Sequence, residues 1–258
     1  MNSEILYSIC MKLLEFEDES AWIAAALHEV DDLIAEAEAE WRVGMRIGRT
    51  RLRLCLAGGS TPEPIYRALA GRPISAAELE LWTGDERLVP PGDPGRNAAM
   101  IARAFGGAVW KTAPRLIPWP ASPGSPEERS FDERLAQAER IAAEHEARLR
   151  FEMGDDPAFD LAFLGLGEDG HTASLFPGQG ILAERKRLCA ASVAPAEPRI
   201  RMSFTYPVLA RVRRIRFLVR GPGKAAIARR LAAGDQALPA AGIEAADQAI
   251  LYCATEAR

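Results

Sequence analysis

Two kinds of segment alternate along the chain: short apolar runs of strand length, and longer stretches in which apolar residues recur every three or four positions. The first kind predicts strands, at 51–56, 78–82, 159–164, 188–193, 201–205, 215–219 and 249–253. The second kind predicts helices, at 20–41, 62–70, 98–105, 125–149 and 224–234. Residues 4–16 fit a strand or a short helix. Because strands that alternate with helices pair in parallel, the pattern predicts an α/β fold with a mostly parallel sheet.

Local signals place the helix ends. Ser20 is an N-cap residue ahead of the first helix, and Ser125 with Glu128 has the spacing of a capping box. Residues 110–126 are rich in proline and predict a surface loop. Because the sheet pattern resumes after this loop, we expect residues 1–258 to form one domain.

The stretch 159–178, FDLAFLGLGEDGHTASLFPG, joins a buried strand to a polar turn spaced by glycines. Its Gly165-x-Gly167-x-x-Gly170 spacing matches the dinucleotide-binding fingerprint, which requires a long helix after the third glycine. Pro177 stops such a helix, and strand 188–193 carries no acid at its end to hold a ribose. We therefore expect no NAD site, and glycines that let the backbone approach a substrate. His171 is the one histidine of the chain that lies in such a turn.

Polar groups also occur at other predicted strand ends. Gly58–Thr61 precedes a helix, so its N–H groups suit an anion, although an ordinary capped turn has a similar sequence. Asp85 and Arg87 form either a site or a surface ion pair. Lys224 follows two glycines at the start of a helix, but the chain has neither the glycine spacing nor the Ser/Thr of a Walker P-loop there. Since parallel strands end at one edge of a sheet, we expect these groups and Arg201 to meet.

Composition narrows the function. The 258 residues carry a net charge of −4, which favours no nucleic-acid partner, and no apolar segment is long enough to cross a membrane. The four cysteines are far apart and predict neither a zinc site nor a disulfide framework, so we expect a cytoplasmic protein without a metal. The chain lacks a G-x-S-x-G nucleophile elbow. Its cations, carboxylate, anion-binding turns and histidine suit a phosphorylated substrate and acid–base chemistry.

Several motifs occur in the order seen in 6-phosphogluconolactonases, and the chain resembles that family from about residue 50 to about residue 235. The motifs are GGSTP at 58–62, TGDERLVP at 83–90, Asn97, GLGEDGHTASLFPG at 165–178, Arg201 with PVL at 207–209, and GPGKA at 221–225. The resemblance implies a three-layer αβα, Rossmann-like fold. It also implies hydrolysis of 6-phospho-D-glucono-1,5-lactone to 6-phosphogluconate in the oxidative pentose phosphate pathway. No cofactor is implied, and we expect a monomer, with a dimer as the alternative.

The resemblance also implies residue roles. His171 is the expected general base, which takes a proton from the water that attacks the lactone carbonyl and returns it to the ring oxygen. Either Asp85 or Asp169 orients the His171 ring. Arg87 and the loop N–H groups either stabilise the oxyanion or bind phosphate. The expected substrate- and phosphate-binding residues are Gly58, Gly59, Ser60, Thr61, Gly170, Arg201 and Lys224.

Some positions depart from the family pattern. Asp93 stands where the family usually has His, Gly95-Arg96 where it has Asp-Ser, and Ala210 where it has Asn, and we expect these changes to affect the substrate rim or affinity. Two alternatives remain. An amino-sugar-phosphate deaminase or isomerase usually has an acid after the histidine, as in GHIAFNEP, and 172–177 has none. A non-enzymatic sugar-phosphate sensor is expected to lack the base, whereas His171 is present.

Overall fold

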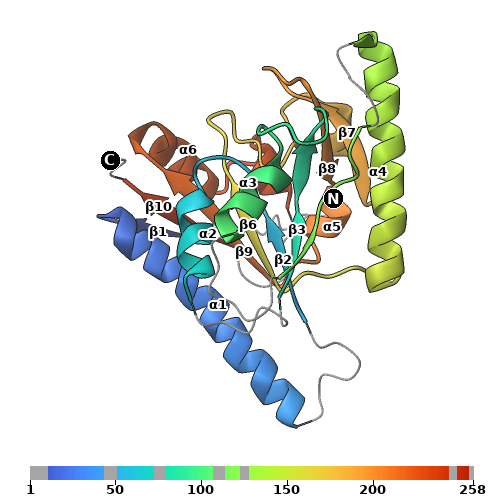
Figure 1. Cartoon of the computed structure of the whole chain (residues 1–258). Coiled ribbons are helices and arrows are strands. Elements are labelled where there is room, and N and C mark those ends of the chain that lie inside the picture. The colour runs from blue at the N-terminus through green and yellow to red at the C-terminus, as the bar shows by residue number, and fades with distance from the viewer. Residues whose placement is uncertain are drawn as a thin grey trace, which may run out of the picture.

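In the part of the chain that the structure describes, the main sheet consists of seven parallel strands (Figure 1). The computed structural model describes residues 11–43, 51–72, 79–106, 114–122, 128–243 and 249–255. From edge to edge the strands are β1 (Lys12–Phe16), β10 (Ala249–Ala254), β9 (Arg214–Arg220), β6 (Leu161–Gly165), β2 (Leu52–Leu56), β3 (Leu79–Thr83) and β5 (Arg115–Ile117). All neighbouring pairs in this sheet are parallel, which confirms the predicted α/β fold.

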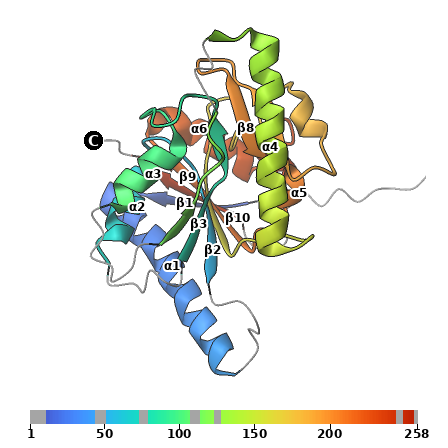
Figure 2. The same ribbon diagram turned by 45° about the vertical axis from the view of Figure 1, so that its right-hand side comes forward.

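Helices cover both faces of this sheet (Figures 1 and 2). Because successive side chains of a strand point to opposite faces, Leu54 and Leu56 pack in the same core as α1 (Glu19–Arg42), α2 (Glu63–Ala70) and α3 (Asn97–Phe105). Cys55 belongs to the opposite core, with α4 (Phe131–Met153), α5 (Tyr206–Leu209) and α6 (Pro222–Ala232). The arrangement is the expected three-layer αβα fold. None of the helices in the described ranges has an apolar stretch that is long enough to cross a membrane.

The sequence predicts that all of these strands belong to one parallel sheet and end at one edge of it. This prediction is wrong for part of the chain, because the structure also has a second, antiparallel sheet. It consists of β4 (Asp85–Arg87), β8 (Ile200–Phe204) and β7 (Cys189–Val193), in that order. The two predicted strands 188–193 and 201–205 therefore pair with each other rather than with the parallel strands. The reason is the short connection at 194–199, because a parallel pair needs a crossover of a dozen or more residues. Short 3₁₀ turns complete the fold at Gly180–Ala183 and Pro239–Gly242.

Some helix ends differ from the prediction. The N-cap of α1 is Asp18 rather than Ser20, and its carboxylate accepts a backbone N–H of the first turn. The capping box of α4 is formed by Ser130 and Glu133, so this helix begins later than expected; residues 125–127 of the predicted box lie outside the described residues. Both cases show a competing polar residue nearby that offers the same cap chemistry. Residues 12–16 form a strand, and 4–10 lie outside the description.

The segment 110–126 is not simply a surface loop. Its described part, 114–122, contains β5, which adds an edge strand beside β3. Trp119 follows this strand and is buried, and its indole N–H donates to the Thr83 carbonyl over 2.8 Å. The prolines that favour a loop flank β5, where an edge strand tolerates them.

His145 of α4 is a buried core residue, as its place beside the apolar stripe predicts. Its ring stacks on Trp119 with a centroid distance of 4.1 Å, and both ring nitrogens are buried without a hydrogen-bond partner in the described chain. Burial, with a smaller effect from the charge of Arg148, lowers the pKa of His145 to about 3.

We expect His145→Phe to make the free energy of unfolding depend less on pH below pH 6.5. Below its ordinary pKa of 6.5 the histidine takes up a proton in the unfolded chain but not in the fold, so stability falls as the pH drops from 6.5 toward 3. One such proton contributes a slope of up to about 1.4 kcal/mol per pH unit. Urea unfolding of both proteins at pH 7, 6, 5 and 4 measures the difference. If the free energy of unfolding had the same pH dependence in wild type and variant, this would contradict the lowered pKa of His145 in the folded protein.

Candidate active site

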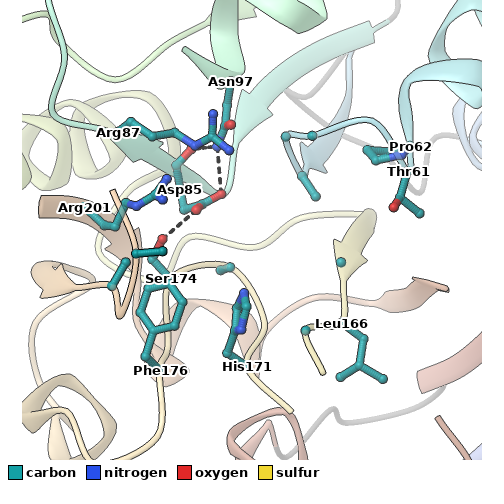
Figure 3. Close-up of a pocket in the computed structure, with 18 of the residues that line it drawn as sticks. Thr61, Pro62, Asp85, Arg87, Asn97, Leu166, His171, Ser174, Phe176 and Arg201 are labelled. Carbon is teal, nitrogen blue, oxygen red and sulfur yellow. Dashed lines mark hydrogen bonds between the residues drawn. The ribbon is translucent and has the colours of Figure 1, made fainter. Parts of the chain in front are cut away.

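A pocket of about 380 Å³ lies at the carboxyl ends of four adjacent strands, β9, β6, β2 and β3 (Figure 3). The segments that follow these strands carry Lys224, His171, Gly58–Thr61 and Asp85, in that order. Strand adjacency therefore brings together groups that are up to 166 positions apart, from 58 to 224. This edge is where open α/β sheets bind ligands.

Most of the predicted site residues line this pocket. They are Gly58, Gly59, Ser60, Thr61, Asp85, Arg87, His171, Arg201 and Lys224. Asp169 is not in the pocket wall but contacts His171. Gly170 is buried, has a φ of +79°, and its Cα is so close to Leu238 that a Cβ would lie 2.7 Å from a leucine methyl carbon. The close approach of Leu238 explains why position 170 is a glycine, and a contact of Gly170 with the substrate stays a prediction.

The His171 ring is held by two neighbours. Its Nδ1 lies 2.5 Å from Asp169 Oδ1, and its ring centroid lies 4.5 Å from that of Phe176. A proton on Nδ1 donates to the carboxylate and leaves Nε2 as the basic nitrogen. Burial raises the pKa of Asp169, but the hydrogen bonds from the His171 backbone N–H and ring together lower it below its ordinary value. Of the two predicted candidates, Asp169 is therefore the one in contact with the ring.

Gly167 permits this contact. A Cβ at this position would lie 2.1 Å from His171 Nδ1 and 2.7 Å from Asp169 Oδ1. The glycine of the apparent dinucleotide fingerprint therefore makes room for the histidine–carboxylate pair. In the described residues no helix follows Gly170 directly; the chain instead forms turns and a short bridge between Thr172 and Leu175. The described residues after Gly170 therefore lack the long helix that the dinucleotide fingerprint requires.

Successive side chains of the GDER motif point to opposite faces of strand β4. Asp85 and Arg87 point to the pocket, and Glu86 between them points the other way. Asp85 accepts hydrogen bonds from Ser174 Oγ (2.6 Å) and Asn97 Nδ2 (3.0 Å). The Asp85 carboxylate thus ties the His171 loop to the start of α3.

Asn97 is a site residue to which the sequence assigns no role. It lines the pocket, and Gly58 passes so close that a Cβ there would lie 1.8 Å from Asn97 Oδ1. Asn97 therefore joins the Gly58 turn to Asp85. Its place in the shared motifs is a signal of importance, but a contact between positions 58 and 97 cannot be predicted from local pattern. The contact of Ser174 with Asp85 cannot be predicted from local pattern either, because the two residues are far apart in the sequence.

Glu86 fixes the start of α3. It is fully buried, and its carboxylate accepts the backbone N–H groups of Arg87 (2.9 Å), Asn97 (2.7 Å) and Ala98 (3.0 Å). Burial raises the pKa of Glu86 in spite of these bonds and the nearby Arg96. The side chain supplies the helix cap that Arg96, at the N-cap position, does not provide.

We expect Glu86→Ala to lower the free energy of unfolding by at least about 2 kcal/mol, because each buried N–H left without a partner costs about 1–3 kcal/mol. Denaturant unfolding measures the effect. Glu38→Ala is a matched control, since Glu38 pairs with Arg42 on the surface of α1 and such pairs contribute about 0.5 kcal/mol or less. Equal effects of the two substitutions would contradict the capping role.

Lys224 lines the same pocket as the Gly58–Thr61 turn. Arg220, at the end of β9, donates to the Ser60 carbonyl over 3.3 Å, so the turn that leads from Arg220 to Lys224 begins beside that glycine turn. Within the described ranges, no carboxylate lies within 4 Å of the Lys224 ammonium group. Backbone N–H groups, two hydroxyl groups and one cation make this side suitable for an anion.

The positions that depart from the family pattern lie outside the pocket wall. Asp93 accepts the Gly95 N–H over 2.6 Å, and Arg96 donates to the Trp119 carbonyl over 2.8 Å. These side chains therefore organise the loop before α3. One of their contacts reaches the pocket, because the Gly95 carbonyl accepts a hydrogen bond from the guanidinium group of Arg87, which lines the pocket wall.

Comparisons with known proteins agree with this architecture. A family model described as glucosamine-6-phosphate isomerases/6-phosphogluconolactonase matches residues 17–252. A 6-phosphogluconolactonase of Streptomyces coelicolor is 33% identical over 227 residues, which cover 84% of this chain and 86% of the relative. One from Synechocystis sp. is 35% identical over 173 residues, or 66% of this chain and 67% of that protein.

The fold also matches solved structures. The 6-phosphogluconolactonase of Trypanosoma brucei superimposes with a TM-score of 0.76, over 94% of this chain and 95% of that one, at 20% sequence identity. This likeness shows that the two proteins share a fold. The family model and the curated relatives show that the amino-acid sequence is similar as well. The chain therefore belongs to the glucosamine-6-phosphate isomerase/6-phosphogluconolactonase family.

Proposed function

We propose that the protein hydrolyses 6-phospho-D-glucono-1,5-lactone to 6-phosphogluconate, the lactonase step of the oxidative pentose phosphate pathway. The observation that carries the proposal is the His171–Asp169 pair beside a pocket with an anion-binding turn and cations to which the described residues offer no carboxylate partner. The names of the curated relatives in the preceding section support the same reaction.

Binding begins with the phosphate group. The Gly58–Thr61 turn and Lys224 hold the phosphate through backbone N–H groups, hydroxyl groups and one ammonium group. The sugar ring then lies across the pocket, with its lactone carbonyl near His171. Fixing the substrate at its unreactive end orients the reacting carbon, which is a large part of the catalytic effect.

His171 Nε2 then acts as the general base. It takes a proton from a water molecule as the water oxygen bonds to C1, and the negative charge moves to the carbonyl oxygen. When the tetrahedral intermediate collapses, the bond from C1 to the ring oxygen breaks and the ring oxygen receives the proton from His171. The carboxylic acid product loses its proton to water. Asp169 keeps the ring oriented and stabilises the imidazolium in between.

The isomerase or deaminase alternative on this fold is less well supported. The residues after His171 offer hydroxyl groups and no acid, and the Ser174 hydroxyl is already bonded to Asp85. A non-enzymatic sensor has no use for a histidine whose ring is oriented by a carboxylate. The proposal also includes a cytoplasmic location and a monomer. The buried free thiols of Cys55, Cys189 and Cys253 support a reducing compartment, and Cys10 lies outside the described residues.

Isotope labelling tests the reaction. The wild-type protein is mixed with the phospho-lactone in water enriched in ¹⁸O, and glucosamine 6-phosphate is offered in parallel. We expect one ¹⁸O atom to enter the product carboxylate faster than in a sample without the protein, and neither ammonia nor a ketose from the amino sugar. Deamination or isomerisation without lactone hydrolysis would favour the alternative reaction of the family.

A further inference from the structure

Two arginines lie directly opposite each other in the antiparallel sheet. Arg87 of β4 and Arg201 of β8 are cross-strand partners, and such partners have Cβ atoms about 4.5–5.5 Å apart. Like charges in this arrangement destabilise a sheet. Both side chains line the pocket. A like-charge pair at a pocket wall points to a ligand anion that binds both guanidinium groups.

Neither guanidinium group is neutralised by the described part of the chain. Arg96, the N-cap residue of α3, pairs with Glu86 at 3.5 Å, but Arg87 and Arg201 have no carboxylate within 4 Å among the residues that the structure describes. Arg87 donates to the Gly95 carbonyl instead. The Nε atoms of both arginines are buried, and none of the described residues offers them a hydrogen-bond acceptor.

The nearby carboxylates do not neutralise the charges of Arg87 and Arg201. The Asp85 carboxylate accepts from Ser174 and Asn97 rather than from either arginine. Burial, followed by the charge of Arg87, lowers the pKa of Arg201 in spite of Asp85 and other acids at longer range. The two cations therefore remain available to a ligand.

The pair is separated from the phosphate side of the pocket. In Figure 3 both arginines lie at the left of the pocket and Thr61 at the right, with His171 between them in this view. The position of Arg201 beside Arg87 differs from the expectation that it binds phosphate together with Ser60 and Thr61. The pocket thus has anion-binding groups on two sides of the general base.

We propose that Arg87 and Arg201 form a carboxylate subsite, which binds the C1 carboxylate of the aldonate product and the carbonyl oxygen as it gains charge during the reaction. The inference rests on the proposed function, because the hydrolysis of the lactone is the step that turns its carbonyl group into a carboxylate. Paired guanidinium donors suit the two oxygens of such a group. The substrate has one charged end and the product has two, so the subsite favours the product and the charged intermediate over the neutral lactone.

Calorimetric binding of two open-chain ligands tests the subsite without any turnover. The ligands are 6-phosphogluconate and glucitol 6-phosphate, which share the phosphate and the carbon chain but carry a carboxylate and a CH₂OH group at C1. We expect wild type to bind the carboxylate at least about tenfold more tightly, as charge-assisted hydrogen bonds do. Arg201→Gln is expected to remove most of this preference and to leave the affinity for glucitol 6-phosphate nearly unchanged.

Lys224→Gln is the matched control at the phosphate side, and we expect it to weaken both ligands by the same factor. Thermal unfolding checks the fold of Arg201→Gln, which should be at least as stable as wild type because the like-charge pair is gone. Equal binding of both ligands by wild type, or equal weakening of both by Arg201→Gln, would overturn the carboxylate subsite and leave the proposed function standing. Failure of wild type to bind either ligand would overturn both.

Discussion

Replacing His171 with alanine is expected to lower kcat for lactone hydrolysis by about 10²–10⁴, which is the usual contribution of a general base. The imidazole is the titratable group in the pocket that is oriented by a carboxylate and leaves a basic nitrogen for water. Stopped-flow measurement of lactone loss, corrected for spontaneous hydrolysis, gives kcat. KM should change little, because the phosphate-binding groups remain.

His28→Ala is the control for this experiment. His28 lies on the surface of α1 with 75% of its side chain exposed and pairs with Asp32 at 3.5 Å. Its removal should leave kcat unchanged. If the two alanine variants retained the same activity, His171 would not be the base, even if the protein proved to be a lactonase.

Gly167→Ala is expected to lower kcat by about 10²-fold although it removes no reacting group. The new Cβ would lie 2.1 Å from His171 Nδ1, so the ring must move, and a displacement of about 1 Å can cost about 10² in rate. Steady-state kinetics and a thermal unfolding curve should show lost turnover in a folded protein. The mechanism of this loss is geometric, in contrast to the chemical loss in His171→Ala.

Gly180→Ala controls for the general cost of replacing glycine near this loop. A Cβ at Gly180 has no neighbouring atom within 4 Å, and the residue lies outside the pocket wall. Normal activity of Gly180→Ala and of Gly167→Ala alike would contradict the close fit between Gly167 and the histidine–carboxylate pair.

Local sequence patterns predict most strands of the parallel sheet, but they do not predict the antiparallel sheet. Strands such as β6 and β9 have apolar runs that identify them, since they are covered on both faces. The antiparallel strand β4 has only the polar residues Asp85, Glu86 and Arg87, and it exists because β8 offers a partner from more than a hundred positions away. The edge strand β5 is equally short and is flanked by prolines, so its pattern predicts a loop.

The candidate site shows the same division. Residues in one continuous motif, such as His171 and Asp169, can be predicted together because the turn itself brings them close. The contact of Asn97 with Asp85 and the opposition of Arg87 and Arg201 depend on strand pairing. For that reason the sequence predicts which chemical groups the site contains. It does not predict which of them bind the phosphate and which bind the carbonyl group.

The central claim, that this pocket hydrolyses a phospho-lactone, is tested most directly by wild-type turnover. Glucose-6-phosphate dehydrogenase generates the lactone in the cuvette, and its disappearance is followed with and without the purified protein. The account predicts loss of the lactone far faster than its spontaneous hydrolysis, saturating with concentration, and slower loss of the lactone without phosphate. A folded wild-type protein that leaves the spontaneous rate unchanged would contradict the account.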